Sequence, residues 1–455
     1  MRFRMSVKSK IELPPYVNCA ISMLERSGFE AFVVGGAVRD LLLGKIVSDF
    51  DITTSAFPSE IKEVFSGYRV IETGIKHGTV TVMIDGEPLE ITTYRVDGEY
   101  EDNRHPKSVT FTRNITEDLA RRDFTVNAIA FNPKTNILDP FGGVGDLENG
   151  IIRAVGNPYL RFCEDALRIL RCVRFASVLG FNVEEETSNG VKALVHLLEN
   201  VSAERIFSEV KKLVCGKNVG KIMAEYPVVM AKIIPPLEKS IGFEQKSKYH
   251  IYDVYEHTYR SLAVSENNLL VRLALLYHDC GKPYVFTEGD DGFRHFIGHQ
   301  KKSSELAEES LLQLKCDSKT LSSVKTLVLY HDYKLTPEKK CIKRFLSKVS
   351  FEEARLIVEI KKADMATHSP EYRFSEFDAV KILDIIDEIE REGECVSLKT
   401  LAIGGDELMN LGIPKGKIIG EILKELLDLV ICEELPNESL MLLEKAKELY
   451  FKRTR

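Results

Sequence analysis

Short apolar runs separated by turn residues make up the first third of the chain, a pattern that is typical of strands in a small sheet. They predict strands at residues 31–35, 78–84, 89–94 and 128–131. Segments 37–43 and 59–65 predict helices that cover the sheet, the second with Ser59 as its N-cap after Pro58. We therefore expect a mixed α/β head.

The pattern changes at about Pro158, where long amphipathic helical segments begin and continue to the end of the chain. Glycine and proline interrupt these segments, but the sequence contains no repeat of fixed period and no low-complexity stretch. The predicted fold class is α+β, with a mixed-sheet head followed by a mostly α-helical body.

The composition of the 455 residues, 44% hydrophobic and 29% charged, is typical of an ordinary soluble protein. No apolar run approaches the roughly 20 residues that span a bilayer, and residues 1–4 precede no signal-peptide core. Nine cysteines without a Cys-x-x-Cys pair indicate reduced thiols, so we expect a cytoplasmic protein without membrane contact. The net charge of −7 means that a nucleic-acid partner would need a local basic groove.

Two glycines and two aspartates form the most informative motif. Gly35 and Gly36 end an apolar run and precede a helical segment, where backbone N–H groups can approach an anion. Asp49 and Asp51 are one residue apart, so in an extended segment their carboxylates share one face while Phe50 points into the core. Paired carboxylates suit Mg²⁺, which completes its shell with phosphates and water. Each motif alone is common in turns and loops, but together they predict nucleotidyl transfer.

Two later segments offer charged groups for nucleotide binding. Arg122 and Asp123 could bind phosphates and ribose hydroxyls, or form a surface ion pair. Further along, four residues at intervals of three are predicted to form a polar ridge on one helix, namely Asp165, Arg168, Arg171 and Arg174. The ridge could pair with a nucleobase edge, or belong to an exposed helix held by ion pairs such as Glu164 with Arg168.

In their order and spacing these motifs resemble the class II tRNA nucleotidyltransferases, the family of CCA-adding enzymes and poly(A) polymerases, whose head is similar to that of DNA polymerase beta. The resemblance covers about residues 14 to 230. It implies that Asp49 and Asp51 are catalytic and hold Mg²⁺. It also implies a nucleotide-binding set of Gly35, Gly36, Arg39, Arg122, Asp123, Asp165, Arg168, Arg171 and Arg174.

By this resemblance, Asp165 and Arg168 act as a protein template that selects C and then A, supported by Arg171 and Arg174. Glu90 stands where the wider superfamily often has a third carboxylate, although a structural role at the sheet edge is an equal alternative. The implied reaction adds the 3′-terminal CCA, or its terminal A, to the 3′ end of tRNA from CTP and ATP, with release of pyrophosphate.

Segment 97–106 resembles the loop that the family needs to add the terminal A, which argues against an enzyme that adds only CC. It does not separate an enzyme that adds the full CCA from one that adds only A. A bacterial poly(A) polymerase is the nearest alternative, and the length of the product distinguishes it.

A second group of histidines and aspartates follows in the helical body, comprising His257, His278, Asp279, His299, His331 and Asp364. Imidazoles and carboxylates arriving from separate helices suit a transition metal. Residues 249–369 resemble an HD domain, which implies a metal site for Ni²⁺, Co²⁺ or Mn²⁺ and hydrolysis of 3′-end phosphates or cyclic phosphates. One alternative is an inherited helical scaffold whose metal site is idle. Another is a protein that is mainly an HD phosphohydrolase, with the head as an RNA-binding module.

Together the two resemblances predict four domains. These are a nucleotidyltransferase head at 14–150, a helical neck with the base-reading helix at 151–230, an HD domain at 245–370 and a C-terminal helical tRNA-binding body at 371–455. In the last domain Gly416 and Lys417 stand at a predicted helix start, where they could meet tRNA phosphates or simply form a turn between helices.

Overall fold

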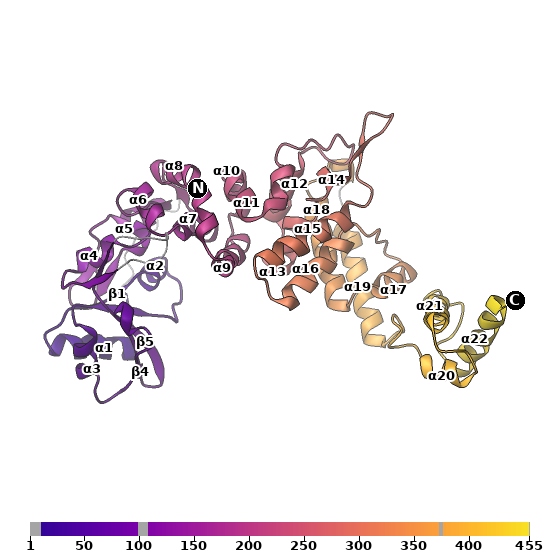
Figure 1. The fold of residues 1–455 in the computed structure, drawn as a ribbon, viewed down its shortest axis with the longest axis horizontal. Coiled ribbons are helices and arrows are strands. Elements are labelled where there is room, and N and C mark those ends of the chain that lie inside the picture. Colours follow the sequence, from indigo (N-terminus) through magenta and orange to yellow (C-terminus); the bar gives the residue numbers. More distant parts are fainter. Residues whose placement is uncertain (1–10, 99–107, 373–375, 455) are drawn as a thin grey trace. The chain divides into compact units, whose positions relative to one another are not determined.

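The computed structural model of the chain describes residues 11–98, 108–372 and 376–454 (Figure 1). It divides into two compact units, residues 1–235 and residues 236–455. The first unit contains the sheet, and the second is built almost entirely from helices. The α+β class, with a mixed-sheet head and a helical body, is therefore confirmed.

The first unit is built on a seven-stranded mixed sheet with strand order β3-β4-β5-β2-β1-β8-β9. Strands β2 and β5 are parallel, and the other neighbours run antiparallel. The strands are β1 Ala31–Val34, β2 Asp51–Thr54, β3 Arg69–Ile71, β4 Thr79–Ile84, β5 Glu87–Thr93, β8 Ala130–Asn132 and β9 Asn136–Leu138. A separate antiparallel pair is formed by β6 Arg95–Asp97 and β7 Val109–Phe111.

All four predicted strands of the head are present, as β1, β4, β5 and β8, with ends shifted by up to two residues. Helices α2 Gly36–Leu42 and α3 Pro58–Val64 confirm the two predicted helices. The N-cap assignment was wrong, because α3 begins at Pro58 and Phe57 is its N-cap. The carboxylate of Glu60 accepts the Phe57 N–H at 2.7 Å, so a side chain inside the first turn satisfies the helix end in place of Ser59.

Short helices follow the sheet and complete the first unit. The head carries α1 Pro15–Arg26, α4 Ile115–Ala120 and α5 Gly143–Asn149. The neck contains α6 Pro158–Glu164, α7 Leu167–Leu179, α8 Glu185–Ala193, α9 Ala203–Val214, α10 Val219–Glu225 and α11 Pro227–Ile233, with the strand pair β10 Ile151–Ile152 and β11 Asn182–Val183. Helix α7 is central, since Leu170 and Val173 are fully buried and the rings of Phe175 and Phe124 meet edge to face at 5.7 Å.

The second unit begins with a group of helices (Figure 1). These are α12 Val254–Val264, α13 Leu269–Tyr277, α14 Lys282–Val285, α15 His299–Gln313, α16 Ser318–Tyr330, α17 Lys339–Leu346, α18 Phe351–Met365 and α19 Glu376–Glu392, with a small hairpin of β12 Thr287–Glu288 and β13 Arg294–His295. The chain ends in α20 Gly405–Asn410, α21 Lys417–Ile431 and α22 Ser439–Thr454, which share an apolar cluster that includes Leu408, Leu426 and Leu442. Among the described residues, no helix is long and apolar enough to cross a bilayer.

Candidate functional site

Asp49 and Asp51 lie at the start of β2, with their side chains exposed. Phe50 between them is only 4% exposed and packs edge-on against Tyr16. The two carboxylates therefore share the solvent side of the segment while the aromatic ring anchors it, as the spacing predicts.

A third carboxylate joins the pair from the neighbouring strand. Glu90 on β5 is the register partner of Asp51 in the parallel β2–β5 ladder, and its side chain is exposed. Partial loss of hydration, then the charges of Asp49 and Glu90, raise the pKa of Asp51, while Arg122 acts in the opposite direction. Three acidic groups that repel one another form a site that a divalent cation would neutralise, so these residues fit Mg²⁺.

The glycine turn lies against an arginine of the predicted nucleotide site. Gly35 has φ of 72°, a conformation that favours glycine, and a Cβ added there would come within 2.8 Å of Arg122 Nη1. Gly36 begins α2 directly afterwards. Arg122 also lies 3.6 Å from Asp118 Oδ2, and its Nη1 donates to the Asn127 carbonyl at 3.4 Å. The glycine turn therefore packs directly against the Arg122 guanidinium, with no room for a side chain at position 35.

Arg39 is held by neighbours inside the protein. It is 9% exposed, donates to Asn127 Oδ1 at 2.6 Å and pairs with Asp40 at 2.7 Å. Its guanidinium also stacks over the Phe175 ring at 5.1 Å. Arg39 therefore lies beside the glycine turn, and most of its N–H groups donate to other residues of the protein.

Asp123 and Arg171, predicted from two separate segments, form a buried ion pair. Arg171 Nη2 lies 2.6 Å from Asp123 Oδ2, and the other oxygen of Asp123 accepts from Asn127 at 2.9 Å and from the Phe124 N–H at 2.8 Å. Burial alone would raise the pKa of Asp123, but Arg171 and Asn127 lower it below its usual range. This pair ties α7 to the head.

The predicted ridge of the reading helix differs from the structure in two ways. Asp165 lies before the helix, in an extended link where its Oδ1 accepts the Leu167 N–H at 3.1 Å. Arg168 and Arg174 are each 8% exposed and are not part of an open surface. An aspartate that accepts a backbone N–H two residues later favours a helix start, which explains why the helix does not run through Asp165.

Each charged group of this segment has a partner on another element or turn. Asp165 pairs with Arg205 at 3.1 Å, and Arg174 donates to Glu209 at 2.7 Å. Arg168 pairs with Glu164 at 2.7 Å, which confirms that predicted contact, and it also donates to the Arg121 carbonyl at 2.8 Å. Asp165 and Arg168 therefore flank the link between α6 and α7, where the Arg168 N–H donates to the Asp165 carbonyl at 2.9 Å while their side chains bond to other partners.

The predicted A-adding loop lies mostly outside the described residues. Asp97 ends β6 and Val109 begins β7, and the two strands pair in antiparallel register. The loop at 97–106 is thus flanked by a short hairpin. At the other end of the chain, α21 begins at Lys417 with Gly416 as its N-cap, as predicted.

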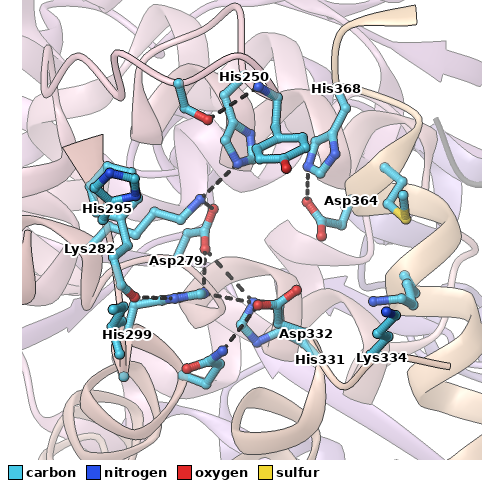
Figure 2. Close-up of a pocket in the computed structure, with 18 of the residues that line it drawn as sticks. His250, Asp279, Lys282, His295, His299, His331, Asp332, Lys334, Asp364 and His368 are labelled. Carbon is cyan, nitrogen blue, oxygen red and sulfur yellow. Dashed lines mark hydrogen bonds and ion pairs between the residues drawn. The ribbon is translucent and has the colours of Figure 1, made fainter. Parts of the chain in front are cut away.

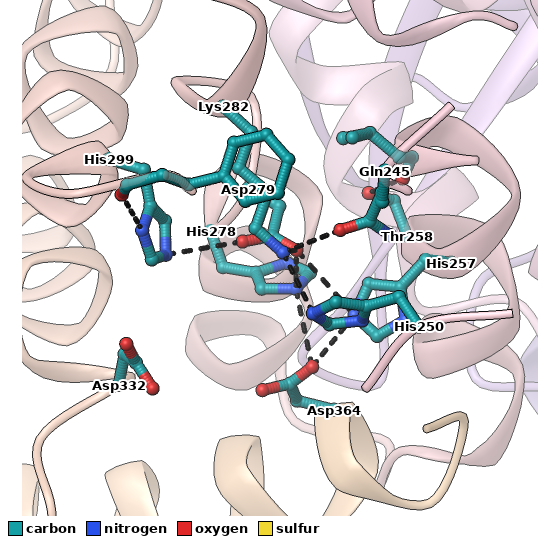
Figure 3. A network of polar contacts seen from close by, with 12 residues as sticks. Gln245, His250, His257, Thr258, His278, Asp279, Lys282, His299, Asp332 and Asp364 are labelled. Atoms are coloured by element: carbon teal, nitrogen blue, oxygen red, sulfur yellow. Dashed lines mark hydrogen bonds and ion pairs between the residues drawn. The ribbon is translucent and has the colours of Figure 1, made fainter. Parts of the chain in front are cut away.

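All six predicted metal ligands of the second unit come together in one buried cluster. Figure 3 labels His257, His278, Asp279, His299 and Asp364. His257 lies on α12, and Asp364 lies near the end of α18, with Nε2 and Oδ1 2.7 Å apart. His278 and Asp279 follow α13, His299 begins α15 and His331 follows α16. Three imidazole nitrogens surround the Asp279 carboxylate. Its oxygens lie 3.3 Å from Nε2 of His278, 3.4 Å from Nε2 of His299 and 3.8 Å from Nε2 of His331.

The orientation of three rings is fixed by backbone carbonyls. Nδ1 of His278, His299 and His331 lies 2.7, 2.9 and 2.8 Å from the carbonyl oxygen three residues earlier. A carbonyl only accepts, so each Nδ1 carries the proton and each Nε2 of a neutral ring offers its lone pair to the cluster. Nε2 atoms of His299 and His331 lie only 3.4 Å apart, an approach that a shared cation would stabilise.

The charges of the cluster also favour a cation. Burial would raise the pKa of Asp279, but His278 and Lys282 lower it well below its usual range. Burial would lower the pKa of His278, yet Asp279 and Asp364 raise it to about 10. Nε2 of His278 makes no well-formed hydrogen bond with any described residue. These donors fit one or two transition-metal ions that share Asp279.

Sequence reasoning missed three members of this centre, His250, Lys282 and His368. Lys282 Nζ lies 2.7 Å from Asp279 Oδ2, and it donates to Gln245 at 2.8 Å and to His250 at 3.2 Å. Nε2 of His368 lies 3.3 Å from Asp364, four residues earlier on the same helix end. The short spacing of Lys282 and His368 from their acidic partners was a signal in the sequence, because a turn at a helix end brings residues three or four apart together.

Asp279, His299, His331 and Asp364 line a cavity of about 980 Å³ (Figure 2). Metal ligands, cationic groups and apolar side chains all line it. A nucleotide-sized molecule fits such a volume.

Three segments of the chain match models of known families. Residues 31–153 match the model described as poly A polymerase head domain, and residues 180–225 match a probable RNA and SrmB-binding site of polymerase A. Residues 286–446, which include His299, His331 and Asp364, match the model described as tRNA nucleotidyltransferase domain 2, putative.

A solved structure with the same overall fold is the Bacillus stearothermophilus CCA-adding enzyme in complex with CTP, with 28% identity, a TM-score of 0.75 and coverage of 97% of this chain and 99% of that one. The Thermotoga maritima CCA-adding enzyme complexed with tRNA, at 21% identity and a TM-score of 0.56, supports the fold alone, with 96% of each chain covered.

Curated relatives match along nearly the whole chain. The CCA-adding enzyme of Pediococcus pentosaceus is 35% identical over 433 residues, which is 95% of this chain and 97% of the relative. The CCA-adding enzyme of Ligilactobacillus salivarius is 35% identical over 441 residues, which is 96% of this chain and 98% of the relative. The chain therefore belongs to the family of CCA-adding enzymes.

Proposed function

We propose that this protein adds the 3′-terminal CCA, or its terminal A, to tRNA, using CTP and ATP and releasing pyrophosphate. The observation that carries the proposal is the group of exposed carboxylates of Asp49, Asp51 and Glu90 beside the Gly35 turn. Family membership supports the same reaction. So does the Bacillus stearothermophilus relative solved with CTP, which is 28% identical.

In the proposed reaction the 3′ oxygen of the tRNA forms a bond to the α-phosphorus of the nucleotide, and the bond from that phosphorus to the pyrophosphate oxygen breaks. Asp49 and Asp51 would hold Mg²⁺, which when bound lowers the pKa of the attacking hydroxyl and neutralises triphosphate charge. The Gly35–Gly36 backbone would let the triphosphate approach closely, and Arg122 would supply positive charge beside it.

Base selection falls to Asp165 and Arg168 in this proposal. A carboxylate accepts and a guanidinium donates, so together they offer a base edge both kinds of hydrogen bond. Glu164 pairs with Arg168 at 2.7 Å and would hold its guanidinium in one orientation. Arg171 and Arg174 would support the reading residues from within α7, and Asp123 would act on the ribose only if its bond to Arg171 opened.

One product analysis separates this proposal from a poly(A) polymerase. The full chain is incubated with tRNA ending at the discriminator base, at -C or at -CC, with CTP or ATP, and the products are sized. Addition of a defined CCA supports the full activity, and addition to the -CC substrate alone supports A-only addition. A long A tail would contradict both.

We also propose that the second unit binds a transition metal and hydrolyses phosphoesters, such as 2′,3′-cyclic or 3′-terminal phosphates on RNA. The observation that favours this activity is the convergence of imidazole nitrogens on two buried carboxylates, Asp279 and Asp364, which line a nucleotide-sized cavity. The metal, when bound, would supply an activated water and a Lewis acid. Hydrolysis would then restore the 3′ hydroxyl that the first unit extends.

Metal analysis and turnover test this second activity. The purified chain is assayed for bound metal and for hydrolysis of 2′,3′-cyclic AMP with Ni²⁺, Co²⁺ or Mn²⁺. Bound metal with turnover that is lost in Asp279→Asn supports the proposal. If the protein neither binds metal nor hydrolyses the substrate, the second unit is only a helical scaffold.

A further inference from the structure

Three lysines are buried among the described residues, and one of them differs from the other two. Lys282 is 4% exposed and pairs with Asp279, and Lys343 is 5% exposed and pairs with Glu394. Lys361 is 8% exposed, and no carboxylate of the described residues lies within ion-pair distance of it. Lysine is rarely this little exposed without a paired anion, so a lysine that lines a cavity and has no carboxylate partner points to a ligand.

Lys361 faces the cavity above the histidine cluster. It lies on α18 three residues before Asp364, so both side chains project from one face of the helix, and both line the cavity. Lys334, three residues after His331, lines the same cavity and is labelled in Figure 2. Its exposed ammonium group also makes no ion pair with any described residue.

The other cations of the cavity are already engaged. Lys282 uses its ammonium group on Asp279, Gln245 and His250. Arg294 pairs with Glu288 at 3.3 Å and donates to the Glu244 carbonyl at 2.6 Å. The uncommitted positive charge of the cavity therefore comes from Lys334 and Lys361.

We propose that Lys334 and Lys361 form an anion subsite that holds a phosphoryl group beside the metal cluster of the second unit. The proposal deepens the phosphohydrolase activity proposed above and rests on it for the substrate class, a nucleotide phosphate. Lysine binds phosphate as a point charge, and the low exposure of the Lys361 side chain strengthens that attraction. Apolar side chains that line the same cavity, among them Leu335, Phe296 and Met365, leave room for the nucleoside.

Two lysines favour a phosphate that carries two charges. A 2′- or 3′-phosphomonoester is a dianion at neutral pH, because the second pKa of a phosphate ester is about 6. A 2′,3′-cyclic phosphate carries one charge. The subsite therefore favours the phosphomonoester over the cyclic phosphate, and loss of the lysines weakens binding of the monoester more than binding of the cyclic ester.

The test measures binding separately from hydrolysis. Inorganic phosphate is titrated into the full-length chain by calorimetry, with Lys361→Gln and Lys334→Gln compared with wild type. Loss of one charged contact is expected to weaken phosphate binding by about 10-fold or more. Lys361→Arg keeps the charge and restores most of the binding, and Lys348→Gln, an exposed lysine away from the cavity, binds as wild type. Unfolding midpoints of the variants verify that they fold.

Hydrolysis of adenosine 3′-monophosphate and of 2′,3′-cyclic AMP is measured on the same proteins. KM is expected to rise about 10-fold for the monoester and less for the cyclic ester, with metal content unchanged. Phosphate binding that depends on both lysines without any hydrolysis by the wild type would retain the subsite and reject the activity. Wild-type binding or KM values in Lys361→Gln, or no phosphate binding by the wild type, would overturn the subsite.

Discussion

Asp51 and Glu90 face each other as register partners on the parallel strands β2 and β5 of the N-terminal sheet. They belong to segments almost forty residues apart in the sequence, and both are exposed. Because neighbouring carboxylates repel each other, the charge of Glu90 contributes to the raised pKa of Asp51. This contact gives the proposed magnesium site a third acidic group.

Glu90→Gln tests that third group. Removing its charge lowers the pKa of Asp51 toward the usual value, so the acid limb of the pH–activity profile of CCA addition moves to lower pH. Loss of about 1 kcal/mol of attraction raises the Mg²⁺ concentration for half-maximal activity about fivefold. Glu87→Gln, on the same strand and exposed, is the control. A Mg²⁺ titration that matches wild type would return Glu90 to a structural role.

Asp51→Asn separates catalysis from folding. CCA addition is expected to fall by at least about 1,000-fold, because metal-ion stabilisation is worth several kcal/mol. Since the pKa of Asp51 is raised in the folded state, its ionised form destabilises the fold above the usual pKa. The variant therefore keeps or exceeds the wild-type unfolding midpoint at pH 7, whereas Asp85→Asn changes neither property. Robust labelling of tRNA by a folded Asp51→Asn or Asp49→Ala protein would contradict the site.

Gly35→Ala and Gly44→Ala form a matched pair. Both glycines have positive φ, 72° and 70°, so an alanine is strained at either position, and the ψ of −130° at Gly35 adds to the strain there. Only at position 35 would the new Cβ meet another group, Arg122 Nη1 at 2.8 Å. We expect Gly35→Ala to lose more stability and also to raise the KM for CTP, measured by urea unfolding and steady-state kinetics. Equal effects of the two changes would show that the contact with Arg122 is unimportant.

Asp123→Asn addresses the buried pair with Arg171. Breaking a buried ion pair leaves an uncompensated guanidinium, so the first unit should lose about 3 kcal/mol of stability. The pKa of Asp123 is depressed in the fold, so its contribution is present above the unfolded value and is lost as pH falls below about 4. Urea unfolding, with hydrogen exchange followed on peptides of α7, measures both effects.

Glu185→Gln, on the surface of α8, is the control for this change. A stable Asp123→Asn protein with a selective rise in KM for nucleotides would instead assign Asp123 to the ribose.

Metal addition should stabilise the second unit. At a Mn²⁺ or Ni²⁺ concentration of about 100 times Kd, the free energy of unfolding rises by about 2.7 kcal/mol. Asp279→Asn should abolish this gain, whereas Asp290→Asn, an exposed aspartate away from the cluster, retains it. Because the pKa of His278 is raised to about 10, a metal must displace a proton at neutral pH, and the gain shrinks as pH falls. An unchanged unfolding midpoint with both metals would contradict the site.

Local patterns were enough to predict the glycine turn and the Asp49–Asp51 pair, because strand alternation and backbone freedom act within a few residues. The exposure of Arg168 and Arg174 could not be predicted in this way. It depends on carboxylates and packing from other elements, such as Glu209 on α9.

The histidine cluster illustrates the same division. His257 and Asp364 were identified by resemblance, but His250 was not, because it lies in a loop that only the fold brings against Lys282 and the rings of His257 and His368. Similarly, the pairing of β2 with β5 joins distant segments, so Glu90 could be suggested from the sequence but not positioned against Asp51.

The hydrogen bonds from His278 and His331 to carbonyls of their own last helical turns have a consequence for synthesis of the chain. Each of these two rings is aimed as soon as its own helix forms, whereas His257 must wait for Asp364, which is translated 107 residues later. During translation the ribosome therefore exposes partly assembled ligands before the last one emerges. The centre is therefore complete only once α18 has been made, because Asp364 is the last of its predicted ligands along the chain.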